Sequence, residues 1–173
     1  MTKLEPQGII VWGILTNNLE LVSEVEKEIE KDYGAIIQKS DAMPFDYTDY
    51  YEKEIGKNIK RMWLVTNKLI NLSELARIKN YARQIEAKYS GENKNRTINI
   101  DPGILTLANF VLATTKNYGH RIYLRDGIFA EVTLIFRDKT FQPLEWTYPD
   151  YRKAVDFFNQ VRIEYNKIII NKK

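Results

Sequence analysis

The run from Gly8 to Leu15 (GIIVWGIL) constrains the fold more than any other segment, because almost every residue in it is apolar. A strand with one face in water alternates polar and apolar residues, so a continuous apolar run predicts a central strand covered on both faces. The run is too short for a membrane span, and no basic start precedes it as in a signal peptide. We therefore expect a soluble, cytoplasmic protein built around this strand.

Hydrophobic periodicity predicts the elements of the first half. Apolar residues recur at three- and four-residue spacing over Leu19 to Tyr33, which predicts an amphipathic helix. A second helix is expected from Asn71 to Tyr89, where Asn71 and Glu74 have capping-box spacing. Strands are expected over residues 8–15, 35–39, 59–66 and 96–101. The resulting β-α-β-β-α-β order is that of a ferredoxin-like unit.

The second half predicts antiparallel strands over residues 110–115, 120–124 and 128–136, followed by a helix from Thr147. A two-residue loop between the last two strands would place Glu131 opposite Ile122, and a three-residue loop would place it opposite Arg121. The three-residue loop is favoured because it gathers apolar residues on one face. Those residues are Ile122, Leu124, Ile128, Ala130, Val132 and Leu134. The fold class is then α+β, with a mixed, largely antiparallel sheet and three main helices.

The length of 173 residues suits a single domain over 1–173. The most polar stretch, residues 90–96 (SGENKNR), is a loop and a candidate seam between the two halves. The stretch is too short to require two domains.

Composition excludes several classes of function. The chain has no cysteine, so we expect no disulfide, no iron–sulfur cluster, no cysteine-ligated zinc and no thiol catalysis. We expect no haem either, and the single histidine excludes a multi-histidine metal site. The net charge is +3, and the segment from Tyr151 to the end carries +4 while the rest carries −1. A dedicated nucleic-acid binder usually has a broader basic field.

Asn99 and Asp101 are candidate site residues because they alternate along one predicted strand and therefore face the same side. Pro102 and Gly103 follow and are expected to turn the chain, which would place Asp101 at a strand end. Such a turn is often only structural, with the Asp bonded to its own backbone.

His120 is the one side chain that titrates near neutrality without help, so it is a candidate general acid or base. A structural histidine that donates to a backbone carbonyl is the alternative. Arg121 and Glu131 are expected to pair across two strands. If exposed, that pair would add only about 0.2–1 kcal/mol, and if buried it would orient His120 or grip an anion. Lys116, at the end of a strand, is a candidate phosphate contact or simply a solvated lysine.

The segment from Phe45 to Gly56 (FDYTDYYEKEIG) is rich in carboxylates and tyrosines. In a short helix, Asp46 and Tyr50 would share a face, and so would Tyr50 and Glu54. Asp46, Glu54 and Asp101 together would suit a hard cation such as Mg²⁺. Acidic loop residues are more often only solvated.

Four segments carry a resemblance to a known family. They are FDYTDYYEKEIG (Phe45–Gly56), RTINIDPGIL (Arg96–Leu105), LATTKNYGHRIYLRDGIFAEVTL (Leu112–Leu134) and WTYPDY (Trp146–Tyr151). Together they resemble the prokaryotic family of domains of unknown function numbered four-four-one-six, over nearly the whole chain. Ile104 departs from the aromatic residue expected after Asp-Pro-Gly. The resemblance implies no activity, because the family has no established function.

Members of that family are sometimes labelled as GTP-binding proteins, and the sequence does not support the label here. A phosphate-binding loop needs G-x-x-x-x-G-K-[ST]. Gly8 and Gly13 have the glycine spacing, but Ile14 and Leu15 stand where Lys and Ser or Thr are required.

The leading hypothesis is a cytosolic enzyme or ligand-binding protein for a small anionic, nucleotide-like molecule. The expected catalytic residues are His120, Asp101 and Glu131, and the expected ligand-binding residues are Arg121, Lys116, Asn99 and Tyr50. His120 would move a proton, Arg121 and Lys116 would hold the anion, and the Phe45–Gly56 segment would act as a lid.

The rival hypothesis is a binding module without catalysis. In one version the basic last helix meets RNA, with Trp146, Tyr148 and Tyr151 stacking on bases. In the other version, apolar faces meet a protein partner or a second copy of the chain as a homodimer.

Overall fold

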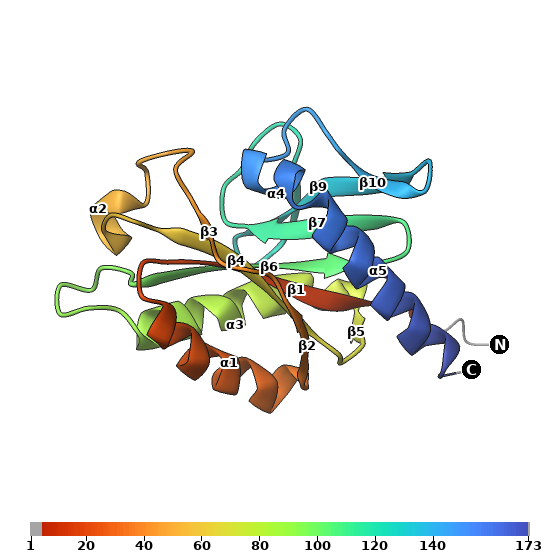
Figure 1. Cartoon of the computed structure of the whole chain (residues 1–173), viewed down its shortest axis with the longest axis horizontal. Helices are drawn as coiled ribbons and strands as arrows, with labels where there is room; N and C mark the ends of the chain where they lie inside the picture. Colours follow the sequence, from red (N-terminus) through yellow and green to blue (C-terminus); the bar gives the residue numbers. More distant parts are fainter. Residues whose placement is uncertain (1–4, 173) are drawn as a thin grey trace.

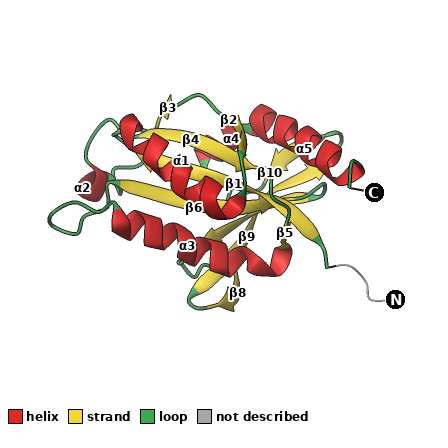
Figure 2. Cartoon of the chain, turned by 90° about the horizontal axis from the view of Figure 1, so that it is seen from below, coloured by secondary structure: helices red, strands yellow, loops and turns green. Residues whose placement is uncertain are grey.

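The computed structural model describes residues 5–172, and its core is one extended sheet with helices on both faces (Figures 1 and 2). The strands are β1 (Gln7–Thr16), β2 (Ile36–Lys39), β3 (Met43–Pro44), β4 (Lys60–Thr66), β5 (Ile70–Asn71), β6 (Ile98–Leu105), β7 (Asn109–Thr114), β8 (Ile122–Arg125), β9 (Ile128–Arg137) and β10 (Thr140–Pro143). The helices are α1 (Leu19–Tyr33), α2 (Glu52–Ile55), α3 (Leu75–Lys88), α4 (Pro149–Lys153) and α5 (Val155–Ile170).

The sheet order is β10-β9-β7-β6-β1-β4-β2. The four strands β6-β1-β4-β2 have the ferredoxin-like order expected for the first half, with α1 and α3 as the crossover helices. β7, β9 and β10 extend the sheet beyond β6, and β8 forms a hairpin with β9. The α+β class is confirmed. Every strand pairing in the part of the chain described is antiparallel, so the sheet is not mixed.

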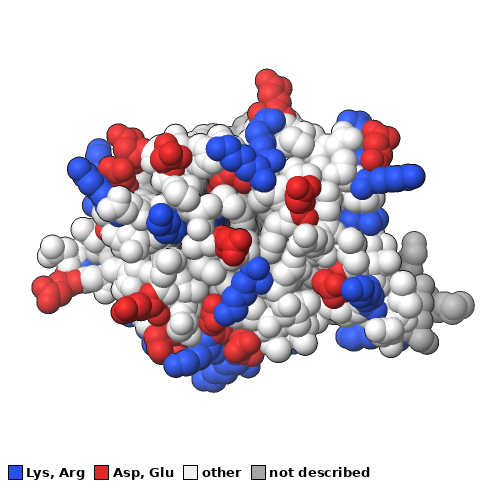
Figure 3. Space-filling view, in the orientation of Figure 1, with Lys and Arg blue, Asp and Glu red and all other residues white. Residues whose placement is uncertain are grey.

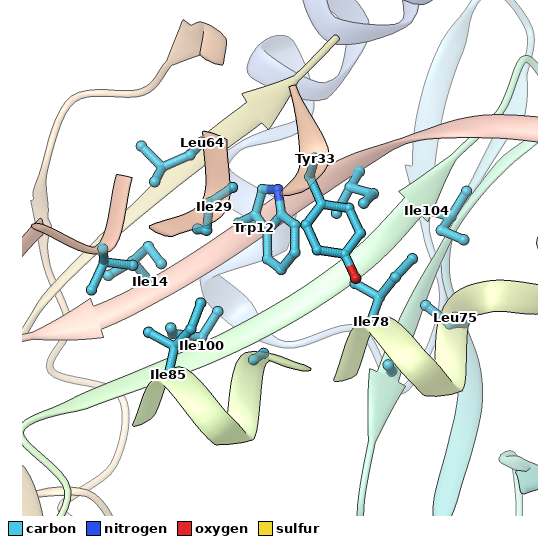
Figure 4. Packing of buried hydrophobic residues seen from close by; sticks show 14 of the residues in the cluster. Trp12, Ile14, Ile29, Tyr33, Leu64, Leu75, Ile78, Ile85, Ile100 and Ile104 are labelled. Atoms are coloured by element: carbon cyan, nitrogen blue, oxygen red, sulfur yellow. The ribbon is translucent and has the colours of Figure 1, made fainter. Parts of the chain in front are cut away.

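β1 lies in the middle of the ferredoxin-like unit and is buried on both faces, as its apolar run predicts. Its even-numbered residues, such as Trp12, pack against α1 and α3, where Tyr33 and Ile78 complete the cluster (Figure 4). Its odd-numbered residues, such as Val11, belong to a second cluster with Phe158 of α5. The period of two along a strand thus distributes one apolar run between two cores.

The ladder between β6 and β7 is short, because it holds only the pairs from Gly103 to Leu105. The N–H of Ile100 donates to Glu86 Oε1 at 2.6 Å, and its carbonyl accepts from Lys79 Nζ at 2.8 Å. Pro102 lies two residues further along, so its nitrogen faces the same edge, where it has no hydrogen to donate to β7. The ladder ends there, and side chains of α3 replace the missing strand partner.

The prediction of a turn at Pro102 and Gly103 is wrong. β6 continues through both residues to Leu105, and Asp101 lies in mid-strand opposite Gly13 of β1. The ladder with β1 runs over eight residue pairs, so strand pairing overrides the local turn preference of the Pro-Gly sequence.

The hairpin of β8 and β9 combines features of the two-residue loop and the three-residue loop considered from the sequence. Arg125 opposes Ile128 across a two-residue turn, and a bulge then shifts Tyr123 and Ile122 into the register expected for the three-residue loop. The expected apolar face is wrong for β8, since Ile122 is 69% exposed and Leu124 is also exposed. α3 covers part of β9, and β8 lies one strand further out.

The expected last helix is two helices, α4 and α5, with Ala154 between them. The polar residues 90–96 lie in the loop between α3 and β6, while the sheet joins strands of both halves. Among residues 5–172, no helix is long and apolar enough to span a membrane.

Candidate functional site

A cavity of about 470 Å³ opens where β6 and β7 part. Eighteen of its 22 lining residues come from the four segments that carry the family resemblance, and four come from β4 and α3. The first group is Phe45, Tyr47, Thr48, Tyr50, Tyr51, Arg96, Asn99, Asp101, Leu112, Ala113, Thr114, Thr115, Lys116, Arg121, Tyr148, Pro149, Asp150 and Tyr151, and the second is Arg61, Lys79, Arg83 and Glu86. Segments far apart in the sequence therefore meet at one site.

The floor of the cavity is an ion pair between Arg61 of β4 and Asp150 of α4. Arg61 Nε donates to Asp150 Oδ2 at 2.8 Å, and the two side chains are only 4% and 1% exposed. A second carboxylate, Asp101, lies 3.8 Å from Arg61 Nη2. Burial opposes the charge on Arg61, but Tyr151, Asp150 and Asp101 raise its pKa above its ordinary value, so the guanidinium stays charged.

Three buried polar atoms at this floor have no hydrogen-bond partner among residues 5–172. They are Arg61 Nη1, Asp150 Oδ1 and Tyr151 Oη. Buried polar groups are nearly always hydrogen-bonded, because an unpaired one costs about 1–3 kcal/mol. The ion pair therefore leaves one donor and one acceptor without a protein partner at the floor.

Gly13 of β1 gives these groups their room. A Cβ atom at this position would lie 2.9 Å from Tyr151 Oη, 3.0 Å from Arg61 Nη1 and 3.1 Å from the Asp101 carbonyl. Two of the three unpartnered atoms thus converge over a residue without a side chain, and any larger residue would push them apart.

Charged side chains of α3 and β6 form the wall beside this floor. Lys79 Nζ donates to Asp101 Oδ1 at 3.1 Å, and Asn99 Nδ2 donates to Asp101 Oδ2 at 2.6 Å. Burial would raise the pKa of Asp101, but Lys79 and Arg61 outweigh it and lower that pKa. Glu86 shows the opposite balance, because burial raises its pKa despite the nearby charge of Lys79.

The mouth of the cavity carries exposed cations and tyrosines. Lys116 Nζ lies 4.1 Å from the centre of the Tyr50 ring. Arg96 is bound by Glu54 at 2.5 Å, whereas Lys116 and Arg83 form no ion pair with any residue of the described range 5–172. The entrance therefore carries two cationic side chains without a carboxylate partner.

Arg121 holds this entrance in place. Its side chain is 2% exposed, and it donates to Glu131 Oε2 at 2.8 Å, to the Lys116 carbonyl at 3.0 Å and to Tyr148 Oη at 3.3 Å. Glu131 also contacts His120 Nε2 at 2.9 Å through the same oxygen, and its side chain is fully buried. The expected pair of Arg121 and Glu131 is present, and it is buried.

The structure brings five of the expected site residues to the cavity lining: Asn99, Asp101, Lys116, Arg121 and Tyr50. His120 and Glu131 lie behind that lining, and His120 stacks on Trp146 with ring centroids 4.7 Å apart. His120 precedes β8 instead of starting a strand.

The proposed metal set is not gathered. Only residues 52–55 of its segment form a helix, so Asp46 and Tyr50 do not share a helical face. Glu54 is bound to Arg96, and Asp101 is bound to Lys79. Residues 5–172 contain no group of three or more Asp, Glu or His side chains that could hold a metal ion.

The basic C-terminal segment is largely occupied by contacts within the chain. Arg152 donates to the carbonyls of neighbouring loop residues, Arg162 donates to the Leu107 carbonyl, and Lys167 pairs with Glu164. Positive and negative side chains are interspersed on the face seen in Figure 3. Tyr151, expected to stack on a base, is buried in the core. Binding of RNA or of a second copy of the chain stays a prediction.

Sequence reasoning missed Arg61, which pairs with Asp150, and Lys79 and Glu86 of α3. Arg61 interrupts the apolar strand IKRMWLVT, and Lys79 and Glu86 lie seven residues apart within the apolar stripe of α3. Charged residues on a face that periodicity assigns to the core were the available signal.

Comparison with known proteins gives a family but no activity. No curated protein and no solved structure matches the chain. The family model described as "Domain of unknown function (DUF4416)" matches residues 6–165, which is nearly the whole chain. Gly8 and Gly13 both lie inside β1, where no phosphate-binding loop can form. Because the family model matches residues 6–165, the chain belongs to the DUF4416 family.

Proposed function

We propose that this protein binds a small anionic molecule in the cavity between β6 and β7, and that it works in the cytoplasm as a ligand-binding protein or as an enzyme for that molecule. The observation that carries the proposal is the mouth of the cavity, where Lys116 and Arg83 are exposed and form no ion pair among residues 5–172. The cavity volume of about 470 Å³ supports it, because sites for small molecules usually measure about 300–1,000 Å³.

The charge of the lining supports an anion. Six lining residues are basic and three are acidic. Glu54 and Glu131 lie outside the lining and neutralise Arg96 and Arg121. Four basic lining residues then face the three acidic ones, and two of the four, Lys116 and Arg83, form no ion pair among residues 5–172. An anion would therefore gain most from contacts at the mouth.

The residues that line the cavity support binding of the molecule more directly than catalysis by His120. His120 and Glu131 do not line the cavity, so a proton transfer by His120 would need contact with the bound molecule from behind Arg121. We assign His120, Arg121 and Glu131 a positioning role: together they fix the backbone of Lys116 and the ring of Tyr148.

Calorimetry and thermal unfolding with a panel of phosphorylated metabolites, nucleotides and dicarboxylates test the proposal. A ligand at one hundred times its dissociation constant adds about 2.7 kcal/mol, which is about 5–11 °C in Tm for a chain of this size. Lys116→Gln with Arg83→Gln should weaken binding of a hit. Lys27→Gln with Arg137→Gln is the matched control, since both residues are exposed and lie outside the cavity. A panel without a hit, or equal loss in both double variants, would contradict the proposal.

A further inference from the structure

We propose that the bound molecule is a nucleoside phosphate, with its base on the floor against Arg61 and Asp150 and its phosphate at the mouth beside Lys116 and Arg83. This inference rests on the proposed function and names the class of its ligand.

The floor is unsuited to the anionic end of a ligand. On the floor and the wall beside it, Arg61 and Lys79 are matched by Asp101 and Asp150, and Glu86 adds a further acidic group, so this part of the cavity has no net positive charge. A phosphate or carboxylate offers only acceptors and brings negative charge. Placed here, it would satisfy Arg61 but would face the free oxygen of Asp150 without a proton between them.

The free atoms of the floor define the complementary group. Arg61 Nη1 can only donate, and ionised Asp150 Oδ1 can only accept. The two side chains are joined through Arg61 Nε and Asp150 Oδ2, so the free atoms belong to the two members of one ion pair. A ligand that satisfies both must present an acceptor and a donor, as every nucleobase does.

Aromatic rings around the same pair favour a flat ligand. The guanidinium carbon of Arg61 lies 5.5 Å from the ring centre of Phe45. Tyr51 also lines the cavity, and Phe45 and Tyr51 pack edge to face with centroids 6.0 Å apart. Aromatic side chains stabilise nucleobases by stacking, and stacking is tolerant of base identity.

The mouth has the complementary character. Lys116 and Arg83 are exposed and form no ion pair among residues 5–172, so they remain available to a phosphate. Arg96 and Arg121 are already neutralised by carboxylates. A neutral polar floor and a cationic mouth thus match a molecule with a neutral hydrogen-bonding ring at one end and phosphate at the other.

The test compares the four nucleoside 5′-monophosphates with ribose 5-phosphate by calorimetry. In the wild type, at least one nucleotide should bind about tenfold to a hundredfold more tightly than ribose 5-phosphate, the effect of one or two hydrogen bonds to charged groups. Asp150→Asn keeps an oxygen for Arg61 Nε but replaces the free acceptor with a donor. It should therefore weaken nucleotide binding about tenfold and leave ribose 5-phosphate unchanged. Lys116→Gln should weaken both.

The outcomes separate this inference from the proposed function. If ribose 5-phosphate binds as tightly as every nucleotide, the protein binds anions but the base assignment is wrong. If nucleotides bind and a soluble, folded Asp150→Asn variant is unaffected, the base does not lie on this floor. If no anion of the panel binds, the proposed function fails and this inference fails with it. The wild-type comparison needs no variant, so it decides the matter even if Asp150→Asn does not fold.

Discussion

Replacing Glu131 with leucine tests how the entrance of the cavity is held. The substitution removes the acceptor of Arg121 Nε at 2.8 Å and of His120 Nε2 at 2.9 Å, and it leaves a guanidinium that is 2% exposed without its counter-charge. Breaking a buried ion pair by removing one partner costs about 3–5 kcal/mol. For a chain of this length, that loss lowers Tm by about 6–20 °C.

The double variant Arg121→Met with Glu131→Leu is the matched control. Removing both charges eliminates the uncompensated guanidinium, so the double variant should be more stable than the sum of the two single effects predicts, by about 1–3 kcal/mol. Urea unfolding of wild type, both single variants and the double variant gives this coupling energy. A loss below about 1 kcal/mol for Glu131→Leu, or strictly additive effects, would refute the reasoning.

Three further outcomes are expected. Gly13→Ala should cost about 1–3 kcal/mol in urea unfolding, because the new Cβ would press on Tyr151 Oη and Arg61 Nη1, and it should abolish ligand binding; an unchanged affinity would contradict the described floor. The lowered pKa of Asp101 contributes stability that is present above its ordinary value of 3.8 and is lost as the pH falls below it, so Asp101→Asn should destabilise the protein more at neutral pH than near pH 3. Glu86 has the opposite effect on the pH dependence of stability, because its pKa is raised and it therefore destabilises the folded protein as the pH rises above 4.5. The stability of Glu86→Gln relative to wild type should therefore increase from acid to neutral pH. A decrease over the same range would contradict this prediction.

Much of the fold follows from periodicity. The helix Leu19–Tyr33 and the ferredoxin-like order were predictable because each element carries its own apolar period. The course of the chain at Pro102 was not, since its turn preference is local and the ladder that overrides it depends on residues ninety positions earlier. The prediction that Ile122 lies on a buried apolar face was wrong for a related reason. The alternation of residues along a strand does not show where the helices that cover the sheet end.

Parts of the site follow from the same local rules. Asn99 and Asp101 face one side because of the period of a strand, and the pair of Arg121 and Glu131 follows from the hairpin register. Asp150 lies in the first turn of α4, and its partner Arg61 lies 89 positions away. No local pattern connects two charged residues from elements so far apart in the sequence.

The parting of β6 and β7 also bears on how the chain avoids self-association. A sheet that splits has two additional edges, and an unpaired edge is a template on which another strand can add. On β6 that edge is closed at Ile100, where Glu86 takes the N–H and Lys79 takes the carbonyl. Glu86 and Lys79 thus also protect the edge of β6 inside the sheet. Without these two side chains, the backbone of Ile100 would be free to pair with a strand from another molecule.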